Sequence, residues 1–325
     1  MAMGRTFKLN SGYEIPAIGL GTWQSKPHEV EKAVETALRV GYRHIDGAAI
    51  YQNETEVGQG WKNSGAPRED IFITSKLWNT HHLPENVEKA VNKTLKDLQT
   101  DYLDLYLIHW PVSFVYSENN PFPTDPETGL IALADVPICD TWSAMEKLVE
   151  SGKIRSIGIS NFSVEKTKEL LKTAKIVPAV NQIEAHPWIQ QPEFMDYMKE
   201  LNILVTAYSP LGNNIYGLPR VVDDPEIHEI ATRLQKDPAQ VLIAWAVQRG
   251  TVVLPKSVTE SRIQSNFQDF VLSDPDFQKL NSMDQHKRYN FPSRWGYDVF
   301  GEAGEEFVKK AAKDFAEQQK AIKVN

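Results

Sequence analysis

Short apolar segments alternate with longer amphipathic segments along almost the whole chain. This alternation constrains the fold most, because strand, helix and strand repeated at this pitch are typical of a parallel sheet, and eight such units can close into a barrel. We therefore predict an α/β fold, a single (β/α)8 TIM barrel. The expected strands are Ala17–Gly19, His44–Asp46, Ile71–Lys76, Leu103–His109, Ile154–Ser160, Ala179–Glu184, Ile203–Tyr208 and Val252–Pro255. The expected helices are His28–Val40, Asn53–Asn63, Pro84–Leu98, Thr141–Ser151, Ser163–Thr173, Gln191–Leu201, Pro225–Gln235, Pro238–Arg249 and Ser261–Phe267.

Segments at both ends of the chain extend this barrel. Thr6–Leu9 and Glu14–Ile15, joined by Ser11-Gly12, predict an N-terminal β-hairpin that plugs the barrel bottom. The tail from residue 284 to 325 contains the aromatic segment Asn290–Trp295, which we expect to cap the barrel mouth, and then a charged, solvated helix from about Glu302 to Lys320. No linker or internal repeat interrupts the chain, so we predict one domain over residues 1–325.

Two long insertions break the even spacing. Pro111–Asp140 and Ser209–Asp224 follow the fourth and seventh expected strands and are rich in Pro, Gly, Asn or Asp. Such loops at the carboxyl ends of barrel strands usually shape a pocket or close over a ligand, although they can also be irregular surface excursions. We expect both loops to shape the catalytic face.

Charge and cysteine content exclude several classes of function. The 325-residue chain has a net charge of −8 and no segment that concentrates Lys and Arg, so a nucleic-acid or anionic-membrane partner lacks its electrostatic footprint. The single cysteine, Cys139, excludes an internal disulfide and a cysteine-based metal site, and no HExxH motif occurs, so we expect no bound metal. Residues Met1 to Leu9 lack an apolar signal core, and the apolar run Val241–Val247 is too short to span a bilayer. We therefore expect a cytoplasmic protein.

Common cofactor and nucleophile motifs are incomplete. Gly19-Leu20-Gly21 begins a dinucleotide fingerprint, but Gln24 stands where a third glycine belongs, so we interpret this segment as a tight turn. None of the 11 tyrosines has a lysine four residues later, which excludes the YxxxK pair of short-chain dehydrogenases. The segment Gly158–Phe162 fails the last position of GxSxG, so hydrolytic nucleophile chemistry has no motif here.

Four ionisable residues stand at or near the ends of neighbouring expected strands. Asp46, Lys76 and His109 close the second, third and fourth strands, and Tyr51 follows Asp46 closely. Because the carboxyl ends of parallel strands converge at one mouth of a barrel, these groups can share a pocket. Taken singly, each residue has a simpler interpretation: a structural ion pair for Asp46 and Lys76, a core-edge tyrosine, and a packing histidine.

The segments that carry these residues resemble the strand ends of the aldo-keto reductase superfamily, whose catalytic tetrad is Asp, Tyr, Lys and His. They are His44–Tyr51, Ile73–Trp78 and Tyr106–Pro111. The tail Tyr289–Pro292 and the loop Gly212–Gly217 are most similar to fungal glycerol dehydrogenases and glyceraldehyde reductases. The resemblance covers nearly the whole chain, in order and spacing, through Gly19–Trp23, Gly158–Phe162, Val180–Glu184, Ala207–Gly212 and Pro255–Val258.

The resemblance implies carbonyl reduction by hydride transfer, and the four residue types suit that chemistry. Negative charge grows on the carbonyl oxygen, so a proton donor is needed there. Tyrosine has a reference pKa of about 10, and lowering it by two units requires roughly 2.7 kcal/mol. An ammonium about 4 Å away, at an effective dielectric constant near 20, supplies ~4 kcal/mol before desolvation. We therefore expect Lys76 to acidify Tyr51 as the proton donor, Asp46 to keep Lys76 charged, and His109 to orient the carbonyl.

The same resemblance implies NADP(H) as the cofactor. Lys256 and Arg262 follow the last expected strand, where barrels often bind phosphate, and Ser261 is placed to cap the next helix. The two cations suit a 2′-phosphate, although they could simply balance Glu260 and Asp269 on a surface helix. The other implied cofactor positions are Ser257 and Val258 beside the phosphate, Asn266 at the adenine, Tyr208 stacked on nicotinamide, Ser160, Asn161 and Gln182 at its carboxamide, Ser209, Pro210 and Leu211 along the pyrophosphate, and Gly21, Thr22 and Trp23 near the ribose, with Asp46 beside them.

Three tryptophans stand beside expected mouth residues and predict an aromatic pocket for the substrate. Trp23, Trp78 and Trp110 join Tyr51 and His109 as expected substrate contacts. Aromatic walls exclude water and accept small aldehydes with little discrimination.

The second insertion narrows the expected substrate class. Asn213, Asn214 and Tyr216 could add hydrogen bonds to substrate hydroxyls. We therefore expect a monomeric, NADPH-dependent reductase of glyceraldehyde, related sugars or dihydroxyacetone that also oxidises polyols such as glycerol. The alternative is a regulatory or redox-sensing NADPH-binding subunit with little turnover, against which the complete tetrad weighs. A barrel glycosidase lacks the pair of carboxylates that it needs.

Overall fold

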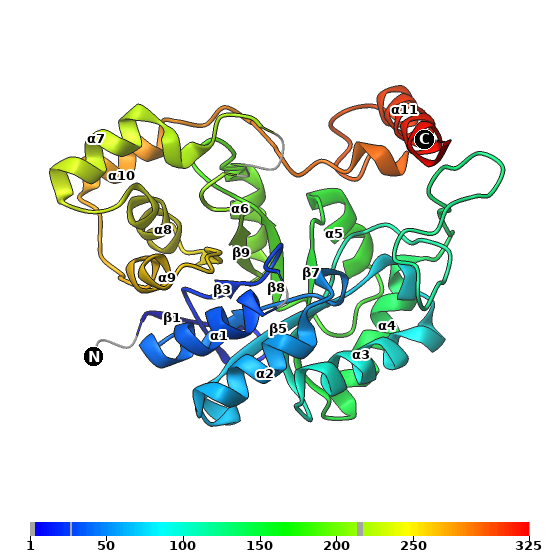
Figure 1. Ribbon diagram of the computed structural model, residues 1–325, viewed down its shortest axis with the longest axis horizontal. Helices are drawn as coiled ribbons and strands as arrows, with labels where there is room; N and C mark the ends of the chain where they lie inside the picture. The colour runs from blue at the N-terminus through cyan, green and yellow to red at the C-terminus, as the bar shows by residue number, and fades with distance from the viewer. Residues whose placement is uncertain (1–3, 27, 213–216, 325) are drawn as a thin grey trace.

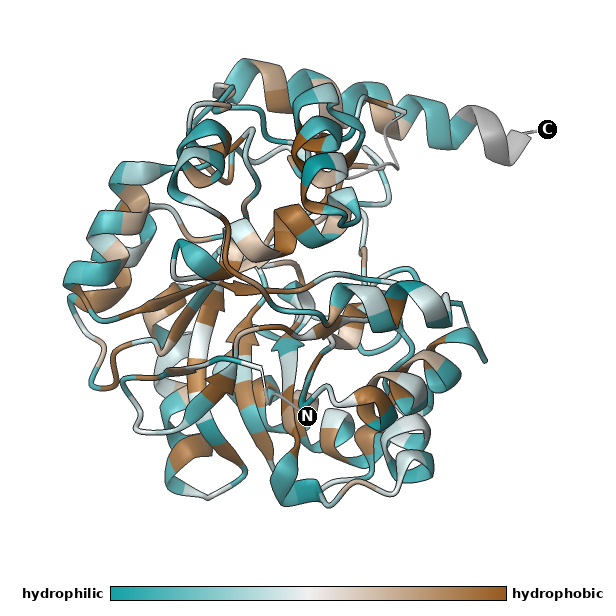
Figure 2. Ribbon diagram, turned by 90° about the vertical axis from the view of Figure 1, so that its left-hand side faces the viewer, coloured by the Kyte–Doolittle hydropathy of each residue, from teal (hydrophilic) through white to brown (hydrophobic). Residues whose placement is uncertain are grey.

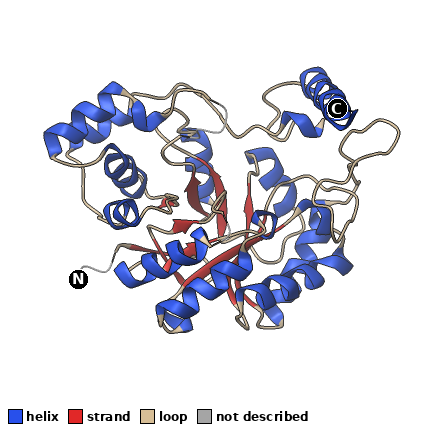
Figure 3. Cartoon of the chain, viewed as in Figure 1, coloured by secondary structure: helices blue, strands red, loops and turns tan. Residues whose placement is uncertain are grey.

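The computed structural model describes residues 4–26, 28–212 and 217–324, and its centre is one sheet of eight parallel strands (Figures 1 and 3). The sheet closes on itself because Gly19 N donates to Val253 O at 2.9 Å and Gly21 N donates to Pro255 O at 3.0 Å. The predicted (β/α)8 fold is therefore confirmed. The strands, in chain and sheet order, are β3 (Leu20–Gly21), β4 (His44–Asp46), β5 (Phe72–Leu77), β6 (Leu103–Ile108), β7 (Ile154–Ser160), β8 (Val180–Glu184), β9 (Leu204–Tyr208) and β10 (Val252–Val253).

Helices surround this sheet, and several begin at residues that the sequence marks as caps. Ser163 Oγ accepts a hydrogen bond from Lys166 N, and the Asp224 carboxylate accepts one from Glu226 N, which satisfies amides that have no partner within the first helical turn. The helices are α1 (Glu29–Val40), α2 (Glu54–Ser64), α3 (Pro84–Leu98), α4 (Ile138–Glu150), α5 (Val164–Leu171), α6 (Pro192–Glu200), α7 (Pro225–Leu234), α8 (Pro238–Gln248), α9 (Glu260–Asn266), α10 (Asp274–Asn281) and α11 (Glu305–Val324). Short 3-10 turns are η1 (Ala49–Tyr51), η2 (Arg68–Asp70), η3 (Asn79–His81), η4 (Val221–Asp223) and η5 (Ser293–Trp295).

The interpretation of Gly19-Leu20-Gly21 as a tight turn is wrong. Leu20 and Gly21 form β3 and pair with Ile45 and Asp46 of β4. A Cβ at Gly19 would lie 2.6 Å from the His44 ring, so close packing inside the barrel, and not a turn, requires glycine there.

The N-terminal hairpin lies at the bottom of the barrel, as predicted. Its strands are β1 (Thr6–Lys8) and β2 (Glu14–Pro16). Leu9 and Ile15 are buried in one cluster with the inward side chains of the lower barrel, which include Phe72 and Leu105. The hairpin thereby covers the amino ends of the strands and leaves the carboxyl ends open to the loops.

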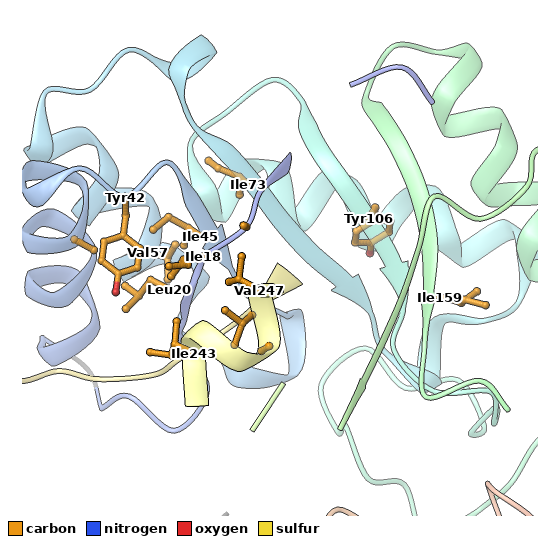
Figure 4. Packing of buried hydrophobic residues seen from close by; sticks show 14 of the residues in the cluster. Ile18, Leu20, Tyr42, Ile45, Val57, Ile73, Tyr106, Ile159, Ile243 and Val247 are labelled. Carbon is orange, nitrogen blue, oxygen red and sulfur yellow. The ribbon is translucent and has the colours of Figure 1, made fainter. Parts of the chain in front are cut away.

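The period of two along each strand decides which side chains enter the barrel. Ile45, Ile73 and Tyr106 point outward into the layer between strands and helices, where Ile243 and Val247 of α8 also lie (Figure 4). Residues one position away face inward, so each strand delivers an inward residue at its carboxyl end. The side chains that point into the barrel therefore alternate along each strand. They are His44 and Asp46 on β4, Phe72, Thr74 and Lys76 on β5, and Leu105 and Leu107 on β6, followed by His109 directly after β6.

The C-terminal segment crosses the open end of the barrel and ends in α11 (Figure 1). One expectation about this segment needs correction, and one helix that precedes it was not predicted. Helix α10 was not predicted, although Ser273 caps it by accepting from Asp276 N. Helix α11 is not simply solvated: its outer face is hydrophilic (Figure 2), but Val308, Ala312 and Ala316 are buried against the body of the protein.

Within the described ranges, no helix combines the length and the apolar character needed to cross a membrane. The prediction of a single domain over residues 1–325 stays a prediction.

Candidate active site

Asp46 and Lys76 form a buried ion pair at the carboxyl ends of β4 and β5. Lys76 Nζ donates to Asp46 Oδ1 at 2.5 Å and to Gly47 O at 2.8 Å. Burial lowers the pKa of Lys76 below its ordinary value, and the carboxylate of Asp46 opposes this shift by favouring the ammonium form. The arrangement agrees with the expected role of Asp46 in keeping Lys76 charged.

The Asp46 carboxylate is fixed from a second side. Gln182 Nε2 on β8 donates to Asp46 Oδ2 at 2.8 Å, across the barrel interior. Thr22 Oγ1 donates to the main-chain oxygen of Asp46 at 2.9 Å. Three residues expected at the cofactor, Thr22, Asp46 and Gln182, therefore form one connected network.

Tyr51 stands at the end of η1, directly after β4, and its ring lies against the other tetrad members. The ring centroid is 5.3 Å from Lys76 Nζ and 5.9 Å from the His109 ring, which it meets edge-on. Burial, aided by the negative charge of Asp46, raises the pKa of Tyr51 well above its ordinary value. This direction is opposite to the acidification that we expected from Lys76, because burial and the negative charge of Asp46 both disfavour the phenolate. The neutral phenol is nevertheless the form that can donate a proton.

His109 is neutral at physiological pH for a physical reason. Burial, and then the positive charge of Lys76, lower the pKa of His109 well below its ordinary value. A neutral imidazole carries one N–H, so it can donate a single hydrogen bond to a ligand.

A cavity of about 990 Å³ opens above the ion pair. Its volume is at the upper end of the usual range for cofactor and substrate sites. Lys76 lies behind the cavity wall, and Asn213, Asn214 and Tyr216 lie outside the described residues. All the other predicted site residues line this one cavity: Gly21, Thr22, Trp23, Asp46, Tyr51, Trp78, His109, Trp110, Ser160, Asn161, Gln182, Tyr208, Ser209, Pro210, Leu211, Lys256, Ser257, Val258, Arg262 and Asn266.

The residues expected at the nicotinamide hold one another in place. Tyr208 OH donates to Asn161 Oδ1 at 2.7 Å, and Asn161 Nδ2 donates to His109 O at 3.0 Å. Ser160 Oγ donates to Gln182 O at 2.9 Å. The ring of Tyr208, which lines the cavity, is thus tied through Asn161 to the strand end that carries His109.

The end of the cavity that we expected to bind a phosphate carries two cations, Lys256 and Arg262. Arg262 is exposed on α9, and no described acidic side chain forms an ion pair with it or with Lys256. Asp269, which we considered as their counter-charge, pairs instead with Arg5 at 2.6 Å. The alternative that Lys256 and Arg262 only balance two nearby carboxylates therefore loses one of those carboxylates, because Asp269 is engaged by Arg5. The expected capping role of Ser261 is wrong, because α9 begins at Glu260 and its cap position is Thr259.

Aromatic side chains wall the other end of the cavity. The Trp78 ring meets the rings of His109 and Trp295 edge-on, and Trp110 meets Trp295 in the same way at 5.2 Å between centroids. Phe122, from the first insertion, packs on Trp78 at 5.4 Å, and Trp78 Nε1 donates to Pro121 O at 2.7 Å. The insertion and the tail therefore both shape the mouth, and Trp23 lines the same cavity.

A model of the aldo/keto reductase family matches residues 17–285 of this chain. The chain belongs to the aldo-keto reductase family. It is 46% identical over 317 residues to a D/L-glyceraldehyde reductase of Hypocrea jecorina, a match that covers 92% of this chain and 95% of the relative. It is 51% identical over 290 residues to an uncharacterized oxidoreductase of Schizosaccharomyces pombe, with 87% and 90% covered. An aldose reductase from Schistosoma japonicum has a similar structure, with a TM-score of 0.85, 45% identity, and 91% and 98% of the two chains covered. The chain is therefore an oxidoreductase, and small carbonyl compounds are its class of substrate.

The structure adds residues of the aldo-keto reductase site that sequence reasoning did not single out. Phe122 and Gln24 line the cavity from segments without a regular period. Glu184, at the end of β8, accepts hydrogen bonds from the main-chain amides of Tyr289 (3.0 Å) and Asn290 (2.8 Å), and so holds the tail over the barrel. The sequence does contain a signal for the role of Glu184, because it is a carboxylate at the end of a fully buried strand. A buried carboxylate requires hydrogen-bond donors from neighbouring groups.

Proposed function

We propose that this aldo-keto reductase uses NADPH to reduce small aldehydes and ketones to alcohols. The observation that carries the proposal is the convergence of Asp46, Tyr51, Lys76 and His109 at one end of a cavity whose other end holds Lys256 and Arg262. One end thus offers proton donors for a carbonyl oxygen, and the other offers cations for a phosphate.

The residues of the cavity fit a phosphorylated dinucleotide. Arg262 presents a guanidinium that no described carboxylate engages, and a guanidinium can hold a phosphate by two hydrogen bonds. Tyr208 presents a ring for stacking, while Asn161 and Gln182 present amides for a carboxamide group. When bound, the nicotinamide group supplies the hydride.

The chain supplies the proton and the orientation of the substrate. The neutral imidazole of His109 donates to the carbonyl oxygen and aligns it, and the phenol of Tyr51 gives its proton to that oxygen as negative charge develops. Lys76 then stabilises the phenolate, because an ammonium that is already oriented by Asp46 needs no reorganisation at that moment.

The substrate class that we propose is glyceraldehyde, related sugar aldehydes and dihydroxyacetone, with glycerol-like polyols oxidised in reverse. The mouth formed by Trp78, Trp110 and Trp295 favours compact substrates, because aromatic walls provide few directional contacts. The relative from Hypocrea jecorina is a D/L-glyceraldehyde reductase, which supports this class. That the protein is cytoplasmic and monomeric stays a prediction.

A panel assay tests the proposal. The purified protein is mixed with NADPH or NADH and with glyceraldehyde, dihydroxyacetone and aromatic aldehydes, and loss of the reduced cofactor is followed by absorbance. We expect turnover of glyceraldehyde with NADPH at a higher kcat/KM than with NADH. Tight NADPH binding without turnover of any carbonyl compound would instead support the regulatory subunit.

A further inference from the structure

Buried polar atoms with no partner gather behind His109, on the side away from the cavity. Within the described chain, His109 Nδ1, His82 Nε2 and both side-chain amide atoms of Asn79 are buried and form no hydrogen bond. A buried donor or acceptor without a partner is costly, because it has lost its hydrogen bonds to water, so native proteins seldom leave one unsatisfied. Polar atoms from three neighbouring side chains in this condition therefore need a common explanation.

The three side chains come from two segments that are joined along their length. His109 N donates to Leu77 O at 3.1 Å, and Phe114 N donates to Asn79 O at 2.9 Å. Between these contacts, His82 Nδ1 and Ser113 Oγ are 2.9 Å apart and hydrogen-bonded. These contacts place the segment that carries His82 beside the segment that carries His109.

We propose that an internal water bridges His82 Nε2 and His109 Nδ1 and that His82 is a positioning residue that selects the tautomer of His109. Internal waters occupy polar sites where they make two to four hydrogen bonds, and the amide of Asn79 offers the further partners.

Either partner of the bond between Ser113 Oγ and His82 Nδ1 can be the donor, and the proposal assigns that role to Ser113. In this arrangement Ser113 Oγ–H donates to His82 Nδ1, His82 Nε2–H donates to the water, and the water donates to His109 Nδ1. His109 must then carry its proton on Nε2, the nitrogen left to face the cavity. The second ring nitrogen of a histidine commonly sets its tautomer in this way.

The tautomer of His109 matters because the Nδ1–H tautomer cannot donate a hydrogen bond to the substrate carbonyl. With the proton on Nδ1, Nε2 would present a lone pair to the carbonyl oxygen and repel it. This consequence rests on the role of His109 in the proposed function, whereas the tautomer itself does not.

Nuclear magnetic resonance of the protein labelled with ring-15N histidine tests the proposal without any turnover. We expect His109 in the wild type to be neutral with the proton on Nε2, and to become a mixture of tautomers in His82→Phe. His82→Gln, whose side-chain amide can donate to the same water, should restore the single tautomer. The matched control is His81→Phe, because His81 bonds Thr80 and packs on Tyr116, outside the chain of donors; it should leave His109 unchanged.

Steady-state kinetics provide the second readout. We expect kcat of His82→Phe to fall about tenfold with an unchanged Kd for NADPH, and His82→Gln to recover most of it. If His82→Phe does not fold, Ser113→Ala takes its place, because loss of the hydroxyl frees both tautomers of His82. A wild-type His109 protonated on Nδ1, or a His109 tautomer indifferent to these variants, overturns the proposal. An Nε2–H tautomer in a protein that reduces no carbonyl would overturn the proposed function alone.

Discussion

Lys76 Nζ lies 2.5 Å from Asp46 Oδ1, with the two side chains 0% and 4% exposed. A pair so deeply buried loses most of its hydration, so its members depend on each other. The pair also spans two strands, β4 and β5, that deliver it to the floor of the cavity. Substitutions in this pair should therefore change the free energy of unfolding and the rate of turnover by different amounts.

Replacing Lys76 by Met should lower the free energy of unfolding by about 3–5 kcal/mol, because it leaves a buried carboxylate without its cation. Lys76→Met/Asp46→Asn should be more stable than Lys76→Met, since the amide needs no counter-charge. Neither variant should recover turnover, because both lack the ammonium. Urea denaturation and NADPH-linked assays measure the two effects; a double variant no more stable than Lys76→Met would contradict the interdependence.

Replacing Tyr51 by Phe should lower kcat by about 10²–10⁴, the usual contribution of a positioned general acid, with little change in NADPH binding. The matched control is Tyr42→Phe, whose hydroxyl donates to Ile263 O at 3.1 Å, far from the tetrad. It should cost about 1 kcal/mol of stability and leave kcat unchanged. Single-turnover kinetics and cofactor fluorescence separate the two effects, and a folded Tyr51→Phe with near wild-type kcat would show that the donor lies elsewhere.

Replacing Arg262 by Ala should weaken NADPH binding by about 10–100-fold, the effect of losing a hydrogen bond between charged partners, and NADH binding by much less. The control is Arg39→Ala, an exposed arginine of α1 that pairs with Glu35 at 2.7 Å. Titration of each variant with both cofactors measures the difference. Equal losses for NADPH and NADH in Arg262→Ala would place the 2′-phosphate somewhere else.

Stability should fall between about pH 4.5 and pH 7 because of Glu54. Burial raises the pKa of Glu54 from 4.5 to about 7, although the hydroxyls of Ser75 and Thr94 donate to its carboxylate. The folded state therefore binds the proton more tightly than the unfolded state. The free energy of unfolding is highest below the unfolded pKa and decreases, on the order of 3 kcal/mol, as pH rises through the folded pKa.

Glu54→Gln should remove this decrease, so the variant gains stability relative to the wild type at pH 8 but not at pH 4.5. Denaturation curves at both pH values measure the change. Glu69→Gln, at an exposed position of η2, is the control and should follow the wild type. An unchanged pH slope in Glu54→Gln would show that Glu54 titrates at its ordinary pKa.

The sequence was sufficient to predict the barrel and the convergence of Asp46, Lys76 and His109 at one end of it, because both depend on short-range patterns. Alternating apolar segments mark the strands, and the period of two places Asp46, Lys76 and His109 on the inward face at one end. The contact between Gln182 and Asp46 joins residues 136 positions apart and depends on how the barrel closes. No local pattern contains that information.

The parts that escaped prediction are those that loops and burial decide. Phe122 reaches the mouth from a segment without a period, so its partners depend on tertiary packing. The expected direction of the Tyr51 pKa was wrong because we weighed the charge of Lys76 without the cost of burying the phenol, which is the largest cause of the raised pKa. Helix α11 was taken as solvated because its charged residues hide the spacing of Val308, Ala312 and Ala316.

The carboxylate of Glu184 should control the order of the tail. It accepts main-chain amides of Tyr289 and Asn290 and the Nε2 of His186 at 3.1 Å. Burial raises the pKa of Glu184, but these hydrogen bonds lower it more, so its folded pKa is below the ordinary value. The contribution to stability is therefore complete above the unfolded pKa of about 4.3 and is lost as pH falls through the folded pKa.

Replacing Glu184 by Gln should release the tail, because an amide offers one acceptor oxygen where the carboxylate offers two and turns N–H groups towards the amides. We expect faster hydrogen exchange at Tyr289 and Asn290, by about 10-fold or more, since hydrogen bonds to a charged group contribute roughly 1.5–3 kcal/mol. The KM for glyceraldehyde should rise more than kcat falls, because the tail carries Trp295 at the mouth. Glu165→Gln, an exposed residue of α5, is the control. Unchanged exchange at both amides in Glu184→Gln would mean that α11 and η5 hold the tail without this carboxylate.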